Sequence, residues 1–123
     1  MRYRISTITF EVIGLGRFGA SLASTLYEMG YQVLGIDADE DSVEAMLSQT
    51  TQSVQLDATD EAALKMFGIT NFDVVVVAIG EDIQASILTT LILKDLGIKH
   101  IVVKAQNDYH GKVLEKIGAD QVI

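Results

Sequence analysis

The chain has 123 residues, 49% of them hydrophobic and 21% charged, and its formal net charge is −8. That length fits one domain with a core of its own, and the acidic balance argues against a surface for nucleic-acid backbones, so no nucleic-acid partner is expected. The absence of cysteine excludes disulfides, thiolate metal sites and cysteine nucleophiles. No apolar run reaches the roughly 18 residues of a membrane span.

Residues 5–10 follow Arg2 and Arg4 and lack the continuous apolar segment of a secretory signal peptide. We therefore expect a cytoplasmic protein. Residues 1–123 are expected to form a single domain. Because the last apolar segment stops abruptly at Ile123, we expect the natural protein to continue beyond it.

Strand-like and helical patterns alternate from end to end. Strands are predicted near residues 9–14, 32–36, 53–57, 73–79, 100–104 and 120–123. Helices are predicted near residues 17–29, 39–49, 60–67, 82–96 and 109–117. This alternation is typical of parallel βαβ units, so the predicted fold class is α/β: a Rossmann doubly wound sheet of six mainly parallel strands with helices on both faces.

A glycine-rich turn joins the first strand to the first helix. Gly14, Gly16 and Gly19 match the pattern G-x-G-x-x-G in that context. The first glycine permits the tight turn, the second allows a pyrophosphate to approach the backbone, and the third lets helix and strand pack closely. Free N–H groups at the start of the helix favour phosphate, so residues 14–19, including Leu15 and Phe18, form a candidate phosphate site.

The second strand ends in Asp37, 21 residues after Gly16, where a ribose-binding carboxylate is expected. Such a carboxylate accepts from both ribose hydroxyls and repels a 2′-phosphate, so NADP is disfavoured. The alternatives for Asp37 are a helix cap or a solvated loop acid. Ala38 and Asp39 follow it and are included in the candidate site.

Three later segments end at the same sheet edge. The first is Asp57-Ala58-Thr59, a candidate adenine contact or, as the alternative, a helix cap. The second is Ala78-Ile79-Gly80, whose small residues admit a nucleotide or relieve crowding. The third contains Lys104, which either meets phosphate or is a surface lysine. Within the glycine turn, Arg17 could reach a terminal phosphate, its alternative being a solvated first-turn arginine.

Catalysis is not expected. His100 is predicted to lie at the surface, at the sheet end opposite the site, and His110 to be a capping or surface group. No spacing of histidines and acids supports a metal site, so catalytic and metal residues are predicted to be none. The helix over 82–96 carries apolar residues around much of its circumference, which predicts a homodimer through this helix and the one over 109–117.

Several long blocks carry a family resemblance: "VIGLGRFG", "DATDE", "VVVAIGEDIQASILTTLILKDLG" and "VKAQNDYHGKVLEKIGAD". With these blocks, in this order, the chain resembles the nucleotide-binding domain of RCK proteins, also called KTN or TrkA-N, and especially the regulatory subunits of Ktr/Trk potassium uptake systems. The resemblance covers nearly the whole chain. Family members generally continue past "IGAD" into a crossover helix and a C-terminal ligand domain, and both are missing here.

The resemblance implies a non-catalytic sensor that binds ATP/ADP or NAD(H) and regulates a membrane potassium-translocating subunit. It implies dimers that assemble into an octameric ring at the inner face of the membrane. Arg17 would then discriminate terminal phosphates. The alternative function is the cofactor-binding domain of an NAD-dependent oxidoreductase; a third is a redox sensor of transcription, which would need an attached basic DNA-binding module.

Overall fold

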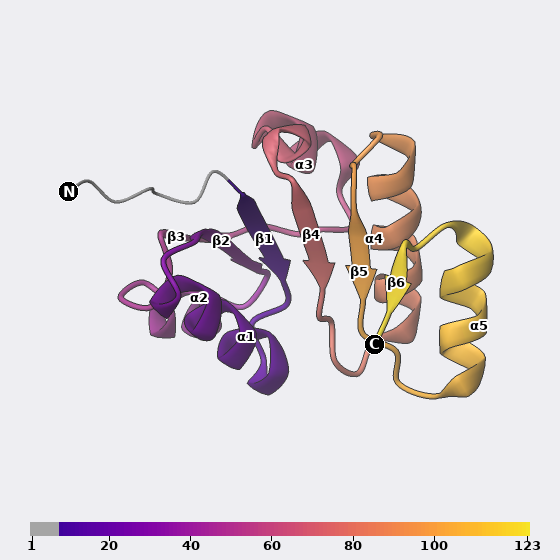
Figure 1. The fold of residues 1–123 in the computed structure, drawn as a ribbon, viewed down its shortest axis with the longest axis horizontal. Helices are drawn as coiled ribbons and strands as arrows, with labels where there is room; N and C mark the ends of the chain where they lie inside the picture. Colours follow the sequence, from indigo (N-terminus) through magenta and orange to yellow (C-terminus); the bar gives the residue numbers. More distant parts are fainter. Residues whose placement is uncertain (1–7) are drawn as a thin grey trace.

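Six parallel strands form one sheet, and helices cover both of its faces, in the computed structural model, which describes residues 8–123 (Figure 1). The strands are β1 (Thr9–Ile13), β2 (Gln32–Asp37), β3 (Gln52–Gln55), β4 (Val74–Val77), β5 (Ile101–Val103) and β6 (Gln121–Val122). Their order, β3-β2-β1-β4-β5-β6, confirms the predicted Rossmann doubly wound sheet. The interpretation of Arg2 and Arg4 falls outside the described residues.

The helices are α1 (Arg17–Glu28), α2 (Glu40–Ala45), α3 (Glu61–Met66), α4 (Ile83–Asp95) and α5 (Asp108–Ile117), with a short 3-10 helix, η1 (Ile69–Asn71). The predicted helix near 39–49 extends too far at its end, because the helix stops at Ala45 and turns follow. No helix was predicted at η1, since three residues carry no periodicity. Among residues 8–123, no helix is long and apolar enough to cross a membrane.

At the carboxyl edge of the sheet, side chains cap the first turn of four helices. The capping residues each accept a hydrogen bond from a backbone N–H in the first turn: Asp39, Asp60, Asp82 and Asn107. Such caps satisfy donors that the helix itself leaves unpaired. The helix starts are therefore fixed along the edge where parallel strands end.

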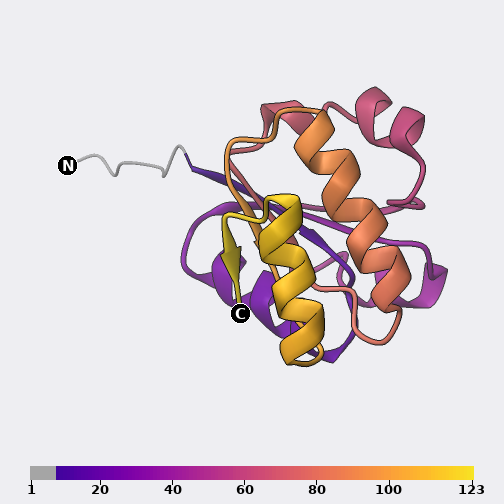
Figure 2. The same ribbon diagram turned by 90° about the vertical axis from the view of Figure 1, so that its right-hand side faces the viewer.

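The core lies in two layers, one on each face of the sheet. On one face, Val12 and Val33 pack with residues of α1 and with Met46, which follows α2. On the other, Ile13 and Val75 pack with Leu64 of α3 and with residues of α4 and α5. Figures 1 and 2 show α1 and α2 on one side of the sheet and α3, α4 and α5 on the other. The period-two alternation of β1 supplies both layers.

One strand residue contradicts the apolar pattern of the core. Glu11, in the middle of β1, is 0% exposed, and its strand neighbours are Leu34 of β2 and Val75 of β4. Neither of its carboxylate oxygens has a hydrogen-bond partner in the described part of the chain. Burial raises the pKa of Glu11 to about 8, so the side chain is mostly protonated at neutral pH.

Candidate functional site

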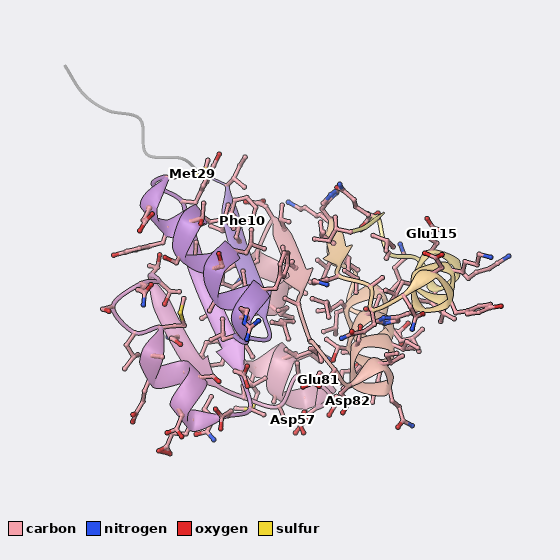
Figure 3. All side chains as sticks on the ribbon, turned by 90° about the horizontal axis from the view of Figure 1, so that it is seen from below. Phe10, Met29, Asp57, Glu81, Asp82 and Glu115 are labelled. Atoms are coloured by element: carbon pink, nitrogen blue, oxygen red, sulfur yellow. The ribbon has the colours of Figure 1, made fainter. Side chains whose placement is uncertain are left out.

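A cavity of about 420 Å³ opens at the carboxyl edge of the sheet, beside the ends of β1, β2, β3 and β4. Its lining residues are Ile13, Gly14, Ile36, Asp37, Ala38, Leu56, Asp57, Ala58, Thr59, Ile79, Gly80, Asp82 and Ala85. Figure 3 shows the molecule from below, with Asp57, Glu81 and Asp82 close to one another. A second cavity of about 500 Å³, beside α5 and β6, includes none of the predicted site residues. Eight of the sixteen predicted site residues therefore line the first cavity.

The three glycines of the turn differ in what surrounds them. Gly14 has a φ of +99°, and a Cβ there would lie 2.8 Å from the carbonyl carbon of Ala78. A Cβ on Gly19 would overlap the carbonyl oxygen of Gly14. Gly16 has an ordinary φ of −75°, and a Cβ there would meet no atom within 4 Å. Neither backbone geometry nor packing within the chain requires glycine at position 16.

Asp37 links the glycine turn to the end of β2. Its Oδ2 atom accepts a hydrogen bond from the Leu15 N–H at 2.7 Å, and Oδ1 accepts one from the Asp39 N–H at 2.8 Å. Asp39, rather than Asp37, caps α2. The helix-cap alternative for Asp37 is therefore wrong, and the carboxylate lies half-buried at the end of β2 rather than in a loop. A carboxylate has about four acceptor positions, so further donors can still be accommodated.

Asp57 and Thr59 form a closed local turn at the other side of the cavity. Asp57 Oδ1 accepts from the Thr59 hydroxyl at 2.6 Å and from the Thr59 N–H at 2.9 Å. The hydroxyl bond is the main cause, with the N–H bond second, of the lowered pKa of Asp57. Asp60 caps α3, so the capping alternative for this pair is wrong. Both Asp57 and Thr59 line the cavity.

Other predicted site residues lie around the cavity rather than in its wall. Leu15, Gly19 and Ala78 are buried. Phe18 is partly exposed, and the Lys104 ammonium lies 5.5 Å from its ring centroid. This is cation–π distance, so Lys104 contacts the first turn of α1. The remaining three, Gly16, Arg17 and Asp39, are exposed.

The two histidines have different outcomes. His100, which precedes β5, is exposed at the opposite edge, as predicted. His110 is 3% exposed, so its prediction as a surface group is wrong. Its ring contacts Gln106 and Ser86 instead. Within residues 8–123, no cluster of histidines and acids could hold a metal ion.

Asp82 and Ala85 were missed by the sequence analysis. Asp82 follows β4, and its side chain accepts from the Ala85 N–H at the start of α4. The rule that ligands bind at the carboxyl ends of parallel strands would have placed both residues at this edge. The glycine turn, Asp37 and this cavity together define a class, the Rossmann domain with a nucleotide-type crevice.

The family follows from comparison with known sequences. The family model described as the TrkA-N domain matches residues 10–123, and the chain belongs to the TrkA-N family. It is 59% identical over 114 residues to the Ktr system potassium uptake protein C of Bacillus subtilis, covering 93% of this chain and 52% of that protein. It is 42% identical to the Ktr system potassium uptake protein A of Vibrio alginolyticus, over 93% and 52% of the two chains. The chain thus spans about half the length of these curated relatives.

Solved structures share the fold. The NAD(P)-binding domain of an exopolyphosphatase-related protein from Archaeoglobus fulgidus superposes with a TM-score of 0.83 at 22% identity, over 93% of this chain and 85% of that one. GsuK bound to ADP gives a TM-score of 0.79 at 27% identity, over 94% and 30%. The first likeness is one of fold alone.

Proposed function

We propose that this domain is the nucleotide sensor of a Ktr-type potassium uptake regulatory subunit, binding ATP/ADP or NAD(H) at the carboxyl edge. The observation that carries the proposal is the cavity of about 420 Å³, which is lined by Gly14, Asp37 and Thr59 together. The solved GsuK structures bound to ADP and to NAD support the same ligand class.

The turn and Asp37 give the two ends of an adenosine diphosphate different partners. Main-chain amides at the start of α1 favour phosphate, and the open space beside Gly16 leaves room for a diphosphate to approach them. Asp37 accepts from ribose hydroxyls and repels a 2′-phosphate, so unphosphorylated adenosine nucleotides are preferred over NADP(H). Exposed Arg17, in the first turn of α1, is then available to a terminal phosphate.

Calorimetric titrations with ATP, ADP, NADH and NADPH test the site. The Asp37→Ala variant is expected to lose about 10-fold to about 100-fold in affinity for every ligand, because charge-assisted hydrogen bonds are lost. The Arg17→Ala variant is expected to lose discrimination between ATP and ADP. Asp95→Ala and Lys65→Ala, exposed changes on α4 and α3, are the matched controls. Unchanged binding in both site variants would overturn the assignment.

The transporter and the assembly belong to the same proposal, supported by 59% identity to a Ktr system protein. The protein would act at the cytoplasmic face of the membrane on a potassium-translocating subunit, as a homodimer within an octameric ring. Leu88 and Leu91 of α4 and Tyr109 and Val113 of α5 are exposed apolar residues on the two helices expected to form the dimer. A nucleotide would change gating by its differential affinity for two states of the assembly.

The alternative, a cofactor domain of an NAD-dependent oxidoreductase, predicts hydride transfer by the full-length protein. Assays of NADH oxidation by that protein with a panel of carbonyl compounds distinguish the two.

Light scattering tests the assembly. A monomeric mass at micromolar concentration contradicts the dimer. A Leu91→Asp variant is expected to dissociate the dimer, because the change places a charge in an apolar interface.

A further inference from the structure

The junction between α4 and α5 contains a buried histidine that the proposed site does not use. His110, in the first turn of α5, is 3% exposed, and its backbone N–H donates to Oδ1 of Asn107, the cap of that helix. Figures 1 and 2 show α4 and α5 side by side on the same face of the sheet. The ring therefore lies where three segments meet: α4, α5 and the loop after β5.

The two hydrogen bonds of the ring determine its tautomer. Nδ1 accepts from the Gln106 N–H at 2.9 Å, and Nε2 lies 3.2 Å from Ser86 Oγ. A backbone N–H can only donate, so Nδ1 carries no proton in the neutral ring. The proton is therefore on Nε2, which donates to Ser86. Protonation of Nδ1 would set two donors against each other and break the bond to Gln106.

Ser86 belongs to the turn of α4 that forms one wall of the cavity. The backbone N–H of Ser86 donates to the carbonyl oxygen of Asp82. Asp82 and Ala85, the residue directly before Ser86, both line the cavity. The Asp82 side chain also accepts from the Ala85 N–H. The ring of His110 is therefore one hydrogen bond away from the residues that form this wall.

The charged groups on the three segments around the ring have other partners or are exposed. Asp82, on α4, is bound to the Ala85 N–H. Lys104, in the loop after β5, lies over Phe18, and Lys112, on α5, lies over Tyr109. Asp108, beside Asn107, is exposed. Burial is accordingly the cause of the lowered pKa of His110, which keeps the ring neutral at neutral pH.

We propose that His110 is a positioning residue for nucleotide binding: its neutral ring holds the α4 wall of the cavity against α5, and on protonation the repulsion between its Nδ1–H and the Gln106 N–H displaces the ring from Ser86 and releases that wall. The inference rests on the proposed function, since the cavity must bind a nucleotide for the coupling to matter. It also predicts that acidification weakens nucleotide binding without any change in the residues that touch the ligand.

The test is a titration of the full-length protein with NAD⁺ from about pH 5.5 to about pH 8, a window that spans the ordinary histidine pKa. NAD⁺ is the probe because its diphosphate diester does not titrate in this window. The affinity of the unchanged protein is expected to fall about 2-fold to about 10-fold toward the acidic end, the effect of losing one hydrogen bond. Nitrogen NMR of the ring is expected to show the proton on Nε2.

Three variants separate the two bonds of the ring. His110→Gln places an amide N–H near the Nε2 position, so it is expected to keep the affinity of the neutral form at every pH. His110→Asn retains only an acceptor near Nδ1, and Ser86→Ala removes the acceptor on α4; both are expected to bind weakly, with little further loss on acidification. Thr90→Val is the matched control, because the Thr90 hydroxyl is buried on the same helix and, among residues 8–123, donates to the Ser86 carbonyl oxygen and not to the His110 ring.

Each outcome has a separate meaning. The same pH profile in His110→Gln as in the unchanged protein, or a proton found on Nδ1 at neutral pH, overturns the coupling alone. Because Glu11 is present in all variants, its titration cancels in the comparison. Failure of the unchanged protein to bind NAD⁺, ADP and ATP at every pH overturns the proposed function, and the coupling with it.

Discussion

Two regions of the molecule bury an ionisable side chain in opposite ways. In the β1–α1 region (residues 9–28), Glu11 is 0% exposed and has no hydrogen-bond partner among the described residues. In the α4–α5 region (residues 83–117), His110 is 3% exposed and both of its ring nitrogens are paired. Equal burial therefore leaves one polar group unsatisfied and the other fully satisfied.

The pKa shifts of the two groups have opposite consequences for stability. Burial raises the pKa of Glu11 from 4.5 to about 8, so the stability it contributes is full below pH 4.5 and is lost as the pH rises through 8. Burial lowers the pKa of His110 from 6.5, so its contribution is full above pH 6.5 and is lost as the pH falls through the folded pKa. The two contributions therefore change in opposite directions as the pH rises.

The largest expected effect lies in the β1–α1 region, in the glycine turn. A Gly19→Ala change would force a Cβ into the Gly14 carbonyl oxygen, where both sides are backbone and cannot turn away. We expect a loss of about 4 kcal/mol or more in unfolding free energy, or failure to fold. Urea unfolding followed by circular dichroism measures it.

Gly16→Ala is the matched control, because its Cβ meets open space. At this helix cap it should cost about 1 kcal/mol of stability or less while weakening nucleotide binding. Equal destabilisation by the two changes would contradict the distinct roles of the two glycines.

The second-largest change in unfolding free energy is expected at Glu11, the buried acid without a partner among the described residues. A Glu11→Leu change is expected to stabilise the domain by about 3 kcal/mol at pH 7, the linkage cost of a carboxyl whose pKa rises from 4.5 to about 8 on folding. The gain should shrink toward pH 5, where the unfolded state also binds the proton. Urea unfolding at the two pH values measures this difference. The exposed change Glu44→Gln, on α2, is the control, and a gain that stays constant with pH would show that Glu11 does not titrate as described.

A smaller effect of the opposite sign is expected at His110. The His110→Asn change should cost about 1 kcal/mol of unfolding free energy at pH 8, because the donor to Ser86 is lost. The cost should diminish as the pH falls below 6.5, since the unchanged protein then loses its own advantage. Thermal unfolding in a series of buffers measures it. A cost that grows on acidification would show that folding raises, rather than lowers, the pKa of His110.

The smallest effect concerns an exposed acid, which serves as a reference for the two buried groups. Thr59→Val removes the hydroxyl bond to Asp57, the main cause of the lowered pKa of that carboxyl. The pKa of Asp57 should therefore rise toward 3.8, with little change in stability. Carboxyl-carbon NMR titration measures it, and Thr70→Val, an exposed change on η1, provides the control. An unchanged pKa of Asp57 would show that the Thr59 hydroxyl is not the cause of its lowered value.

Much of the site could be predicted because its signals are local. The turn from Gly14 to Gly19 and the acid ending the second strand lie at fixed spacings within one βαβ unit. Asp57 and Ile79 follow strands that predict the same edge, and both line the cavity. Asp82 also lines the cavity, but its place at the start of a predicted helix indicates a cap and not a binding residue.

The amino-acid sequence by itself determined the order of strands and helices, the parallel sheet and the glycine turn, since hydrophobic periodicity, helix caps and glycine conformation act over a few residues. Only the tertiary structure decided that Glu11 is buried without a partner and that His110 bonds to Ser86, 24 residues away. The solvation and the partner of a polar side chain depend on strand register and helix packing, which join segments far apart in the chain.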